Sequence, residues 1–321
     1  MEKLAQESRF KVFKVLKLLG VAVPLAILAI AAFHFPYDVD APLTPEELDK
    51  SRKYYEEAYR KPEAGEPESP SAYETKYIQM ATFWAEVSHI KEDVEALAAR
   101  HRLKGQQVLE IGSGRGYLQD VVEDYTGLDI SPNVRRFYHK KFVLGSATAL
   151  PFADESFDGG WSVWVLEHVP NPEQALRECR RVMRDGAVLI LQPAWNVSSA
   201  AADGYRVRPY SDFGLGGKLI KAAAPIRFSQ PYKAAERIPA RLVRKVTSWF
   251  GPTTLHYTRL TPNYKEYWEP DSDGLNSLDR HEMMLWFQSR GDECLNCAGA
   301  DGSIFAYGER WLVIRVNKKR K

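Results

Sequence analysis

The sequence predicts an α/β fold around a mostly parallel sheet, and two segments carry this prediction. In the first, an apolar run ends in Glu110, passes through glycines at every second position (Gly112, Gly114 and Gly116) and re-enters apolar sequence. This pattern is typical of a strand, a tight turn and the start of a helix, where glycine permits a positive φ and a close approach to a ligand. In the second segment, another apolar run ends in Asp129. Together they predict a nucleoside-binding turn with an acid that holds the ribose hydroxyls.

The spacing of the glycines discriminates between nucleotide cofactors. A dinucleotide-binding turn that starts at Gly112 would need glycine at position 117, where the chain has Tyr117, and no second mononucleotide-binding half follows. The phosphate loop of nucleoside triphosphatases is also absent from the sequence. Both cofactor classes are therefore disfavoured. Taken alone, Asp129 could instead be an acid that caps a turn.

Four motifs in order give residues 108–196 a family resemblance. They lie at 109–116, 128–131, 150–158 and 165–169, and a predicted helix at 173–184 then leads into a strand at 187–191. In this order they resemble the core of the class I S-adenosylmethionine-dependent methyltransferases, in particular the type 11 group that acts on small or lipid-like molecules.

The resemblance implies a fold. It is a Rossmann-like, doubly wound and mostly parallel seven-stranded sheet with an antiparallel last strand. A helix at about 278–290 and short strands near 294–297 and 311–316 would be the elements that close this sheet. An N-terminal hydrophobic helix and a helical cap insertion are expected in addition to the core.

The resemblance also implies S-adenosyl-L-methionine as cofactor. The glycine turn would pass beneath its methionine part, Asp129 would hold the ribose and Ile130 would pack on the adenine. Many relatives carry an acid where this chain has Ser146, so a hydroxyl or a backbone carbonyl would replace it here. The full expected set is Glu110, Gly112, Ser113, Gly114, Gly116, Asp129, Ile130, Ser131, Ser146, Ala147, Ser162 and Val163.

His168 is the nearest candidate for a general base. It follows the fourth predicted strand, at the carboxyl edge of the sheet where open α/β folds bind ligands. Methyl transfer requires alignment of the acceptor and exclusion of water, with a base where the acceptor atom holds a proton. Glu167 is the second candidate. The alternative is that His168 only shapes the pocket or hydrogen-bonds a loop.

Composition sets broad limits on the protein. The chain has 321 residues, 45% of them hydrophobic, and a net charge of +2, which is enough for one sizeable core and accessory pieces. Three cysteines argue against a disulfide framework. Cys294 and Cys297 form a lone C-x-x-C pair without a second pair or nearby histidines, so no metal site is predicted.

The N-terminal region contains an apolar stretch, 18–35, that has no charged residue. As a helix it would be about 27 Å long, close to the thickness of a hydrocarbon core of about 30 Å. We expect a membrane anchor or a shallow insertion. A cleaved signal peptide, a helix lying in the membrane interface and a buried core helix are the alternatives.

The charges around this stretch raise a question of topology. Five lysines and arginines precede it, so the positive-inside rule places the N-terminus in the cytoplasm and sends the rest of the chain across. S-adenosylmethionine, however, is a cytosolic cofactor. A stretch that enters one leaflet and returns, or lies shallow, resolves the conflict. We therefore expect a membrane protein with its catalytic domain on the cytoplasmic face.

A basic segment, 204–260, also predicts membrane contact. It holds eleven lysines and arginines against two acids, a net charge of +9. Apolar residues at 238, 242, 246, 249 and 250 repeat at helical spacing between basic residues, which is typical of a helix on anionic lipid. Nucleic acid could use the same charge, but the apolar stripe and the aromatic pair favour lipid. An ordinary cap helix that packs its apolar face on the core is the alternative.

Five regions follow from these observations. They are 1–36, a membrane-associated segment; 37–72, a helix from about Thr44 to Tyr59 and a proline-rich linker; 73–195, helices and the cofactor-binding core; 196–275, the basic cap; and 276–321, the last helix and closing strands.

The combined hypothesis is a membrane-associated methyltransferase for a lipophilic or lipid-linked acceptor. In the cap region, Trp195, Tyr205, Tyr210 and His256 are the candidates for acceptor contact. A catalytically silent subunit of a membrane assembly is one alternative. A nucleic-acid methyltransferase is the other, but the Asn/Asp-Pro-Pro-aromatic signature of base-methylating enzymes is absent at 162–169.

Overall fold

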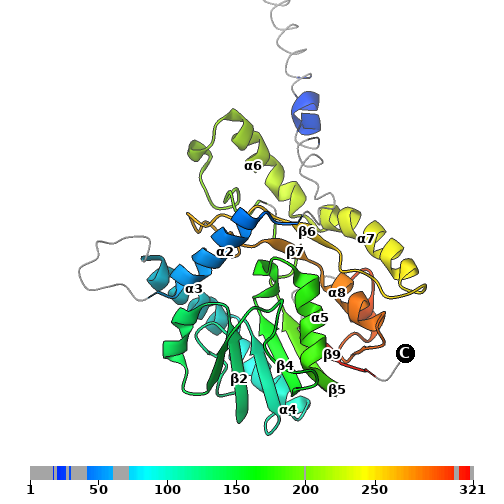
Figure 1. Cartoon of the computed structure of the whole chain (residues 1–321). Helices are drawn as coiled ribbons and strands as arrows, with labels where there is room; N and C mark the ends of the chain where they lie inside the picture. Colours follow the sequence, from blue (N-terminus) through cyan, green and yellow to red (C-terminus); the bar gives the residue numbers. More distant parts are fainter. Residues whose placement is uncertain are drawn as a thin grey trace, which may run out of the picture.

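The computed structural model describes residues 17, 20–26, 29, 42–60, 72–198, 200–306 and 311–318. A seven-stranded sheet in the order β3-β2-β1-β4-β5-β9-β8 forms the core (Figure 1). Strands β1 to β5 are mutually parallel, and β9 is antiparallel to both of its neighbours, as the resemblance implies. The strands are β1 Gln107–Ile111, β2 Asp124–Asp129, β3 Lys141–Leu144, β4 Phe157–Val163, β5 Met183–Gln192, β8 Glu293–Cys294 and β9 Leu312–Arg315.

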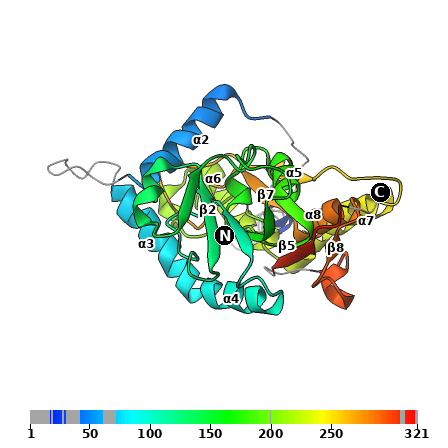
Figure 2. The same ribbon diagram turned by 60° about the horizontal axis from the view of Figure 1, so that its bottom comes forward.

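Helices cover both faces of this sheet (Figure 2). Side chains alternate along a strand, so Leu189 and Leu191 of β5 join one hydrophobic cluster and Val188 and Ile190 join the other. Helices α5 (Pro172–Val182) and α8 (Arg280–Gln288) supply residues to the first cluster, and α4 (Ile90–Arg100) supplies residues to the second. The sheet is therefore doubly wound.

Two further helices precede the core. Helix α2, Pro45–Ala58, begins with the expected capping box, in which Thr44 and Glu47 bond each other's backbone amides. Helix α3 spans Ala72–Val87. The 3-10 helices are η1 Pro132–Phe137, η2 Leu166–His168, η3 Tyr210–Asp212 and η4 Gly299–Gly302.

The helix expected after the glycine turn is not formed. Residues 114–120 make consecutive turns, with bonds of the i to i+3 type such as that from the Gln119 amide to the Gly116 carbonyl. The Gln119 side chain instead bonds the backbone at Phe137 and His139, in the connection between β2 and β3. The prediction that this turn lies at the positive end of a helix is therefore wrong.

The cap contains two helices, α6 (Leu215–Arg227) and α7 (Gln230–Thr247), followed by a small antiparallel sheet of β6 (Tyr257–Arg259) and β7 (Asn276–Leu278). Figure 1 shows both helices beyond one end of the main sheet. These elements, except β7, lie within the region 196–275, for which the sequence predicts a helical cap.

Helix α7 faces the core with its basic side, which is opposite to the alternative of a cap helix that packs its apolar face on the core. Arg241 is buried and bonds Asp279, and Arg244 bonds Glu282. Both acids lie at the start of α8. A buried carboxylate without a partner is costly in free energy, so the two arginines stabilise these acids. The apolar side is exposed and continues to Trp249 and Phe250, which are 72% and 85% exposed. Helical periodicity identified the two sides of α7 but could not tell which one faces inward.

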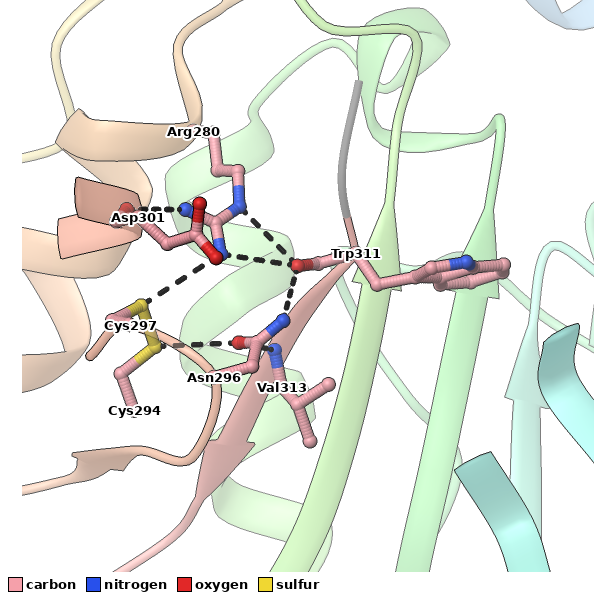
Figure 3. Close-up of a disulfide and its surroundings, with 7 residues drawn as sticks. All are labelled: Arg280, Cys294, Asn296, Cys297, Asp301, Trp311 and Val313. Carbon is pink, nitrogen blue, oxygen red and sulfur yellow. Dashed lines mark hydrogen bonds between the residues drawn. A yellow bond between two sulfur atoms is a disulfide. The ribbon is translucent and has the colours of Figure 1, made fainter. Parts of the chain in front are cut away.

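A disulfide joins Cys294 and Cys297 beside β9 (Figure 3). Although the cysteine count argued against a disulfide framework, this single local bridge is present. Asn296, between the two cysteines, donates to the Trp311 carbonyl and accepts from the Val313 amide. The bridged segment is thereby tied to the last strand.

The apolar stretch 18–35 lies largely outside the described residues. Residues 20–26 are helical, and Val21, Val23 and Leu25 are exposed. Among the described residues, no helix combines the length and the apolar character needed to cross a membrane. In Figure 1 residues 20–26 lie on the side of the molecule that carries α6 and α7.

Candidate active site

A cavity of about 710 Å³ lies at the carboxyl ends of the parallel strands. Its wall includes Gly112 after β1, Val163 at the end of β4 and Gln192 at the end of β5. The cap supplies the opposite wall, including Phe228 and Lys233. The cavity thus joins the edge of the sheet to the α6–α7 corner of the cap.

The glycine turn forms one part of this wall. Gly112, Gly114 and Gly116 all have positive φ, at 70°, 48° and 71°. The amides of Gly112 and Ser113 donate to the Leu128 carbonyl at 2.8 and 2.9 Å, which fixes the turn on β2. A Cβ at position 112 would overlap the Val165 side chain. Glycine is therefore required here both by the conformation and by the lack of space.

Asp129 is buried at the end of β2. It accepts hydrogen bonds from the amides of Gly114 at 2.8 Å and Ser131 at 2.9 Å. Burial raises its pKa, against the effect of these donors. In this state Asp129 ties the glycine turn to β2, as in the turn-capping alternative, and it is not among the residues that line the cavity.

The remaining residues expected at the cofactor divide into two groups. Glu110, Gly112, Ser113, Gly114 and Val163 line the cavity. Glu110 accepts a hydrogen bond from Tyr125, and burial raises its pKa to about 8. Ser162 donates to the Ile111 carbonyl at 3.0 Å, a structural role. The expected residues that do not line the cavity are Gly116, Asp129, Ile130, Ser131, Ser146, Ala147 and Ser162.

His168 lines the same cavity and lies among carboxylates. Its Nδ1 is 3.7 Å from Oδ2 of Asp273, and its Nε2 is 3.8 Å from Oε1 of Glu167. Burial disfavours the charged imidazole, but Asp273, Glu167 and Asp271 outweigh it, so the pKa of His168 lies above its usual value. Burial also raises the pKa of Glu167. The arrangement suits a group that takes up a proton.

Glu167 itself does not line the cavity. Its side chain is fully buried, and Oε1 accepts a 3.0 Å hydrogen bond from the Ala194 amide. It therefore stabilises a positive charge on His168 without facing the cavity itself.

Sequence reasoning missed several residues of this site. Tyr59 at the end of α2, Tyr77 of α3 and Tyr267 line the cavity, together with Asp271 and Asp273. Burial raises the pKa of all three tyrosines, so they remain neutral hydroxyls. Tyr59 lies in region 37–72, for which the sequence predicts a helix and a linker, and Tyr77 lies in the helices predicted before the first strand of the core. No motif marks either residue.

Of the four residues expected to contact an acceptor, one lines the cavity and three do not. Trp195 is buried and lines the cavity. Tyr205 stacks on Phe213 with ring centroids 4.9 Å apart, and Tyr210 lies on the surface beside Lys221. Neither tyrosine lines the cavity, nor does His256. The prediction for these three residues is not supported by their positions.

One group of side chains has the spacing of metal ligands. Ligand atoms of Glu167, His168 and Asp271 lie within 4.8 Å of one another. One Glu167 oxygen is already bound by the Ala194 amide. Glu167 and Asp271, together with Asp273, raise the pKa of His168, so their proximity to this ring also has an electrostatic role.

Comparison with known proteins decides between nucleoside-binding families. A family model described as a methyltransferase domain matches residues 109–191. Residues 109–191 form a class I methyltransferase domain. The match begins in β1 and ends in β5, so it contains the glycine turn, Asp129 and His168.

Curated relatives carry the same domain. The chain is 30% identical over 149 residues to malonyl-[acyl-carrier protein] O-methyltransferase 1 of Coxiella burnetii, covering 43% of this chain and 52% of that protein. It is 26% identical over 191 residues to the fatty-acid O-methyltransferase of Mycolicibacterium smegmatis, covering 53% and 68%. The chain spans little more than half the length of the first two curated relatives that it matches, 52% and 58%.

Solved structures show similarity as well. A methyltransferase from Thermotoga maritima aligns with a TM-score of 0.40 at 18% identity, over 76% of this chain and 97% of that one.

S-adenosyl-L-methionine is the cofactor of this methyltransferase domain. The residues present fit it, because Gly112, Ser113 and Gly114 line the cavity in a positive-φ turn whose two glycines carry no side chain. Gly112, Ser113 and Gly114 would hold its methionine part, and Asp129 its ribose. The side chain of Asp129 would exchange at least one backbone donor to do so.

Proposed function

We propose that this protein is a membrane-associated methyltransferase that transfers a methyl group from S-adenosylmethionine to a lipophilic or lipid-linked acceptor. The continuity of the cavity carries the proposal: the glycine turn, His168 and the α6–α7 corner line one space. Two relatives point the same way, since one is named a fatty-acid O-methyltransferase and another, from Caenorhabditis elegans, a sterol 4-C-methyltransferase.

When bound, the cofactor supplies an electrophilic methyl group and its own leaving group. The chain's task is then to place the acceptor, exclude water and remove a proton. His168 in its neutral form accepts the proton of the acceptor at a ring nitrogen. The imidazolium that results is stabilised by Asp273 and Glu167. Tyr59 and Tyr77 close the cavity from α2 and α3.

Membrane association rests on the exposed side of the cap. Leu242, Val243 and Val246 of α7 are exposed, and Trp249 and Phe250 extend this surface. Apolar and aromatic side chains of this kind are stabilised at a lipid interface. The apolar stretch 18–35 adds a second contact, and the catalytic domain then lies on the cytoplasmic face, where the cofactor is found.

The inward arginines weaken the nucleic-acid alternative. Arg241 and Arg244 bond Asp279 and Glu282 and are therefore not available to phosphates on a surface. Binding to RNA in preference to anionic vesicles would reverse this conclusion.

Titration calorimetry of the full chain with S-adenosylmethionine is the first test. We expect binding, and we expect Asp129→Ala to weaken it strongly. The purified protein and methyl-labelled cofactor are then incubated with a lipid extract. Label in the lipid fraction, lost in Asp129→Ala, supports the proposal. Absence of binding at millimolar cofactor would overturn it and leave a silent subunit of a membrane assembly.

A further inference from the structure

The cavity is unevenly charged. Its His168 end carries Asp271 and Asp273, with Glu167 behind. The α6–α7 corner contributes Arg227 from the last turn of α6, and Lys233 and Arg237 from α7. Arg206, which precedes α6, also lines the cavity. Four cations thus line the cap end, opposed there by the two carboxyls of Glu236 and Glu269.

Three of these cations interact electrostatically with one carboxyl. Burial raises the pKa of Glu236, and the charges of Arg237, Arg227 and Lys233 act against this rise. Burial likewise raises the pKa of Glu269. Four cations therefore face two carboxyls along this part of the wall, which leaves an excess of positive charge among the lining residues.

Arg206 completes the corner. Its guanidinium lies over the Phe228 ring, 4.8 Å from the centroid, and Phe228 directly follows α6. Its contact with Glu269 is long, with Nη1 3.7 Å from Oε2. A guanidinium held on an aromatic face and only loosely paired retains donors for a ligand.

Arg237 provides an unsatisfied donor. Its side chain is 14% exposed, and Nη1 lies 3.3 Å from Oδ2 of Asp279. Its Nε is buried and has no hydrogen-bond partner in the part of the chain that the structure describes. A buried unpaired donor of a charged group is costly, and an oxyanion ligand would satisfy it. The helix dipole adds positive potential at the start of α7, and no acidic residue in its first turn offsets it.

We propose that Arg206, Arg227, Lys233 and Arg237 form a subsite that binds the anionic group of the acceptor, a phosphate or a similar oxyanion. This inference rests on the proposed methyltransferase function. The carboxylates around His168 repel an anion, so the charged group enters the cap end and the methyl-accepting group faces His168. Val197, Ala201 and Leu260, which pack together and line the cavity, offer an apolar wall to the rest of the molecule. The acceptor class is accordingly an amphiphile with an acidic headgroup.

The test uses short-chain probes below their micelle concentration, so that no membrane surface is present. Dihexanoylphosphatidic acid, uncharged dihexanoylglycerol and inorganic phosphate are titrated into the full chain without cofactor. We expect the phosphatidic acid to bind at least about tenfold more tightly than the uncharged lipid, since charge-assisted hydrogen bonds are the difference between them. Inorganic phosphate should compete with it weakly.

The variant Arg227→Gln/Lys233→Gln should lose this preference. Lys218→Gln/Lys245→Gln removes the same charge from α6 and α7 at positions that do not line the cavity, and should retain it. If the double variant does not fold, the single variant Lys233→Gln is used in its place to measure the loss of headgroup preference. Equal affinity for the two lipids, an equal loss in both double variants, or phosphate binding as tight as that of the phosphatidic acid would overturn the subsite.

Cofactor titration of the same samples separates the two proposals. A protein that binds S-adenosylmethionine but shows no headgroup preference loses only the subsite. A protein that binds no cofactor loses the proposed function.

Discussion

Nδ1 of His168 lies 3.7 Å from Oδ2 of Asp273, and the two side chains are 13% and 2% exposed. The same oxygen accepts a 2.9 Å hydrogen bond from the hydroxyl of Tyr55, on α2. The pKa of His168 is therefore raised by the carboxylate of Asp273 in the cap. The hydroxyl of Tyr55 on α2 holds this carboxylate in place. Both partners are far from His168 in the sequence.

Replacement of Asp273 by Asn should lower the pKa of His168. The pKa is raised because carboxylates stabilise the imidazolium, so removal of one of them favours the neutral ring. Tyr55→Phe should shift it the opposite way, since Oδ2 then loses its competing donor. NMR titration of the histidine ring protons measures both shifts, with His168→Gln to assign the signal.

The catalytic consequence has a definite sign. Only the neutral imidazole accepts a proton, so methyl transfer should increase as pH rises through the pKa of His168. In Asp273→Asn this increase should begin at lower pH. An unchanged pH profile together with a shifted NMR titration would show that His168 is not the base.

Gly112→Ala should destabilise the fold and abolish cofactor binding. An alanine would hold φ near 70° with strain and would overlap Val165. We expect a loss of about 2–4 kcal/mol in the free energy of unfolding, from strain of about 1 kcal/mol and an overpacked core. Chemical denaturation measures it.

Two further variants separate these causes. Gly186 also has a positive φ, 83°, but nothing lies within 4 Å of a Cβ there, so Gly186→Ala should show the strain alone. Adding Val165→Ala to Gly112→Ala should recover part of the difference. Similar losses in Gly112→Ala and Gly186→Ala would disprove the steric argument.

The core of the fold could be predicted from the sequence because its signals are local. The glycine turn, the apolar run before Asp129 and the capping box at Thr44 each specify their own backbone. The helix predicted after the turn is not formed, and the cause lies in tertiary contacts. The side chain of Gln119 bonds the connection between β2 and β3 and does not support a helical turn.

The site could be predicted only in part. The glycine turn and His168 come from motifs within 60 residues of each other, whereas Asp273, Tyr77 and Lys233 reach the cavity through long-range packing. Nothing in their local sequence marks them. Similarly, the acids that turn the basic side of α7 inward lie on α8, and no reading of α7 alone could include them.

Arg241→Ala should cost about 3–5 kcal/mol in the free energy of unfolding, because it leaves Asp279 buried with one partner fewer. Arg241 is 3% exposed and also donates to the carbonyls of Ile304 and Ala306. Lys245→Ala, one turn further along α7, should change stability by less than about 0.5 kcal/mol. Comparable effects of the two substitutions in urea denaturation would show that α7 is not held by its inward arginine.

Trp249→Ser/Phe250→Ser should weaken binding of the full chain to anionic vesicles. Each side chain is mostly exposed, and its burial in an interface is worth about 1.5–3 kcal/mol, so a loss of at least about tenfold in partition is expected. Phe305→Ser is the matched control, since Phe305 is 64% exposed but lies outside the cap. Vesicle sedimentation measures the partition. If the double variant and the control have the same effect, or neither has any, the cap does not contact the membrane, and any binding comes from the N-terminal stretch.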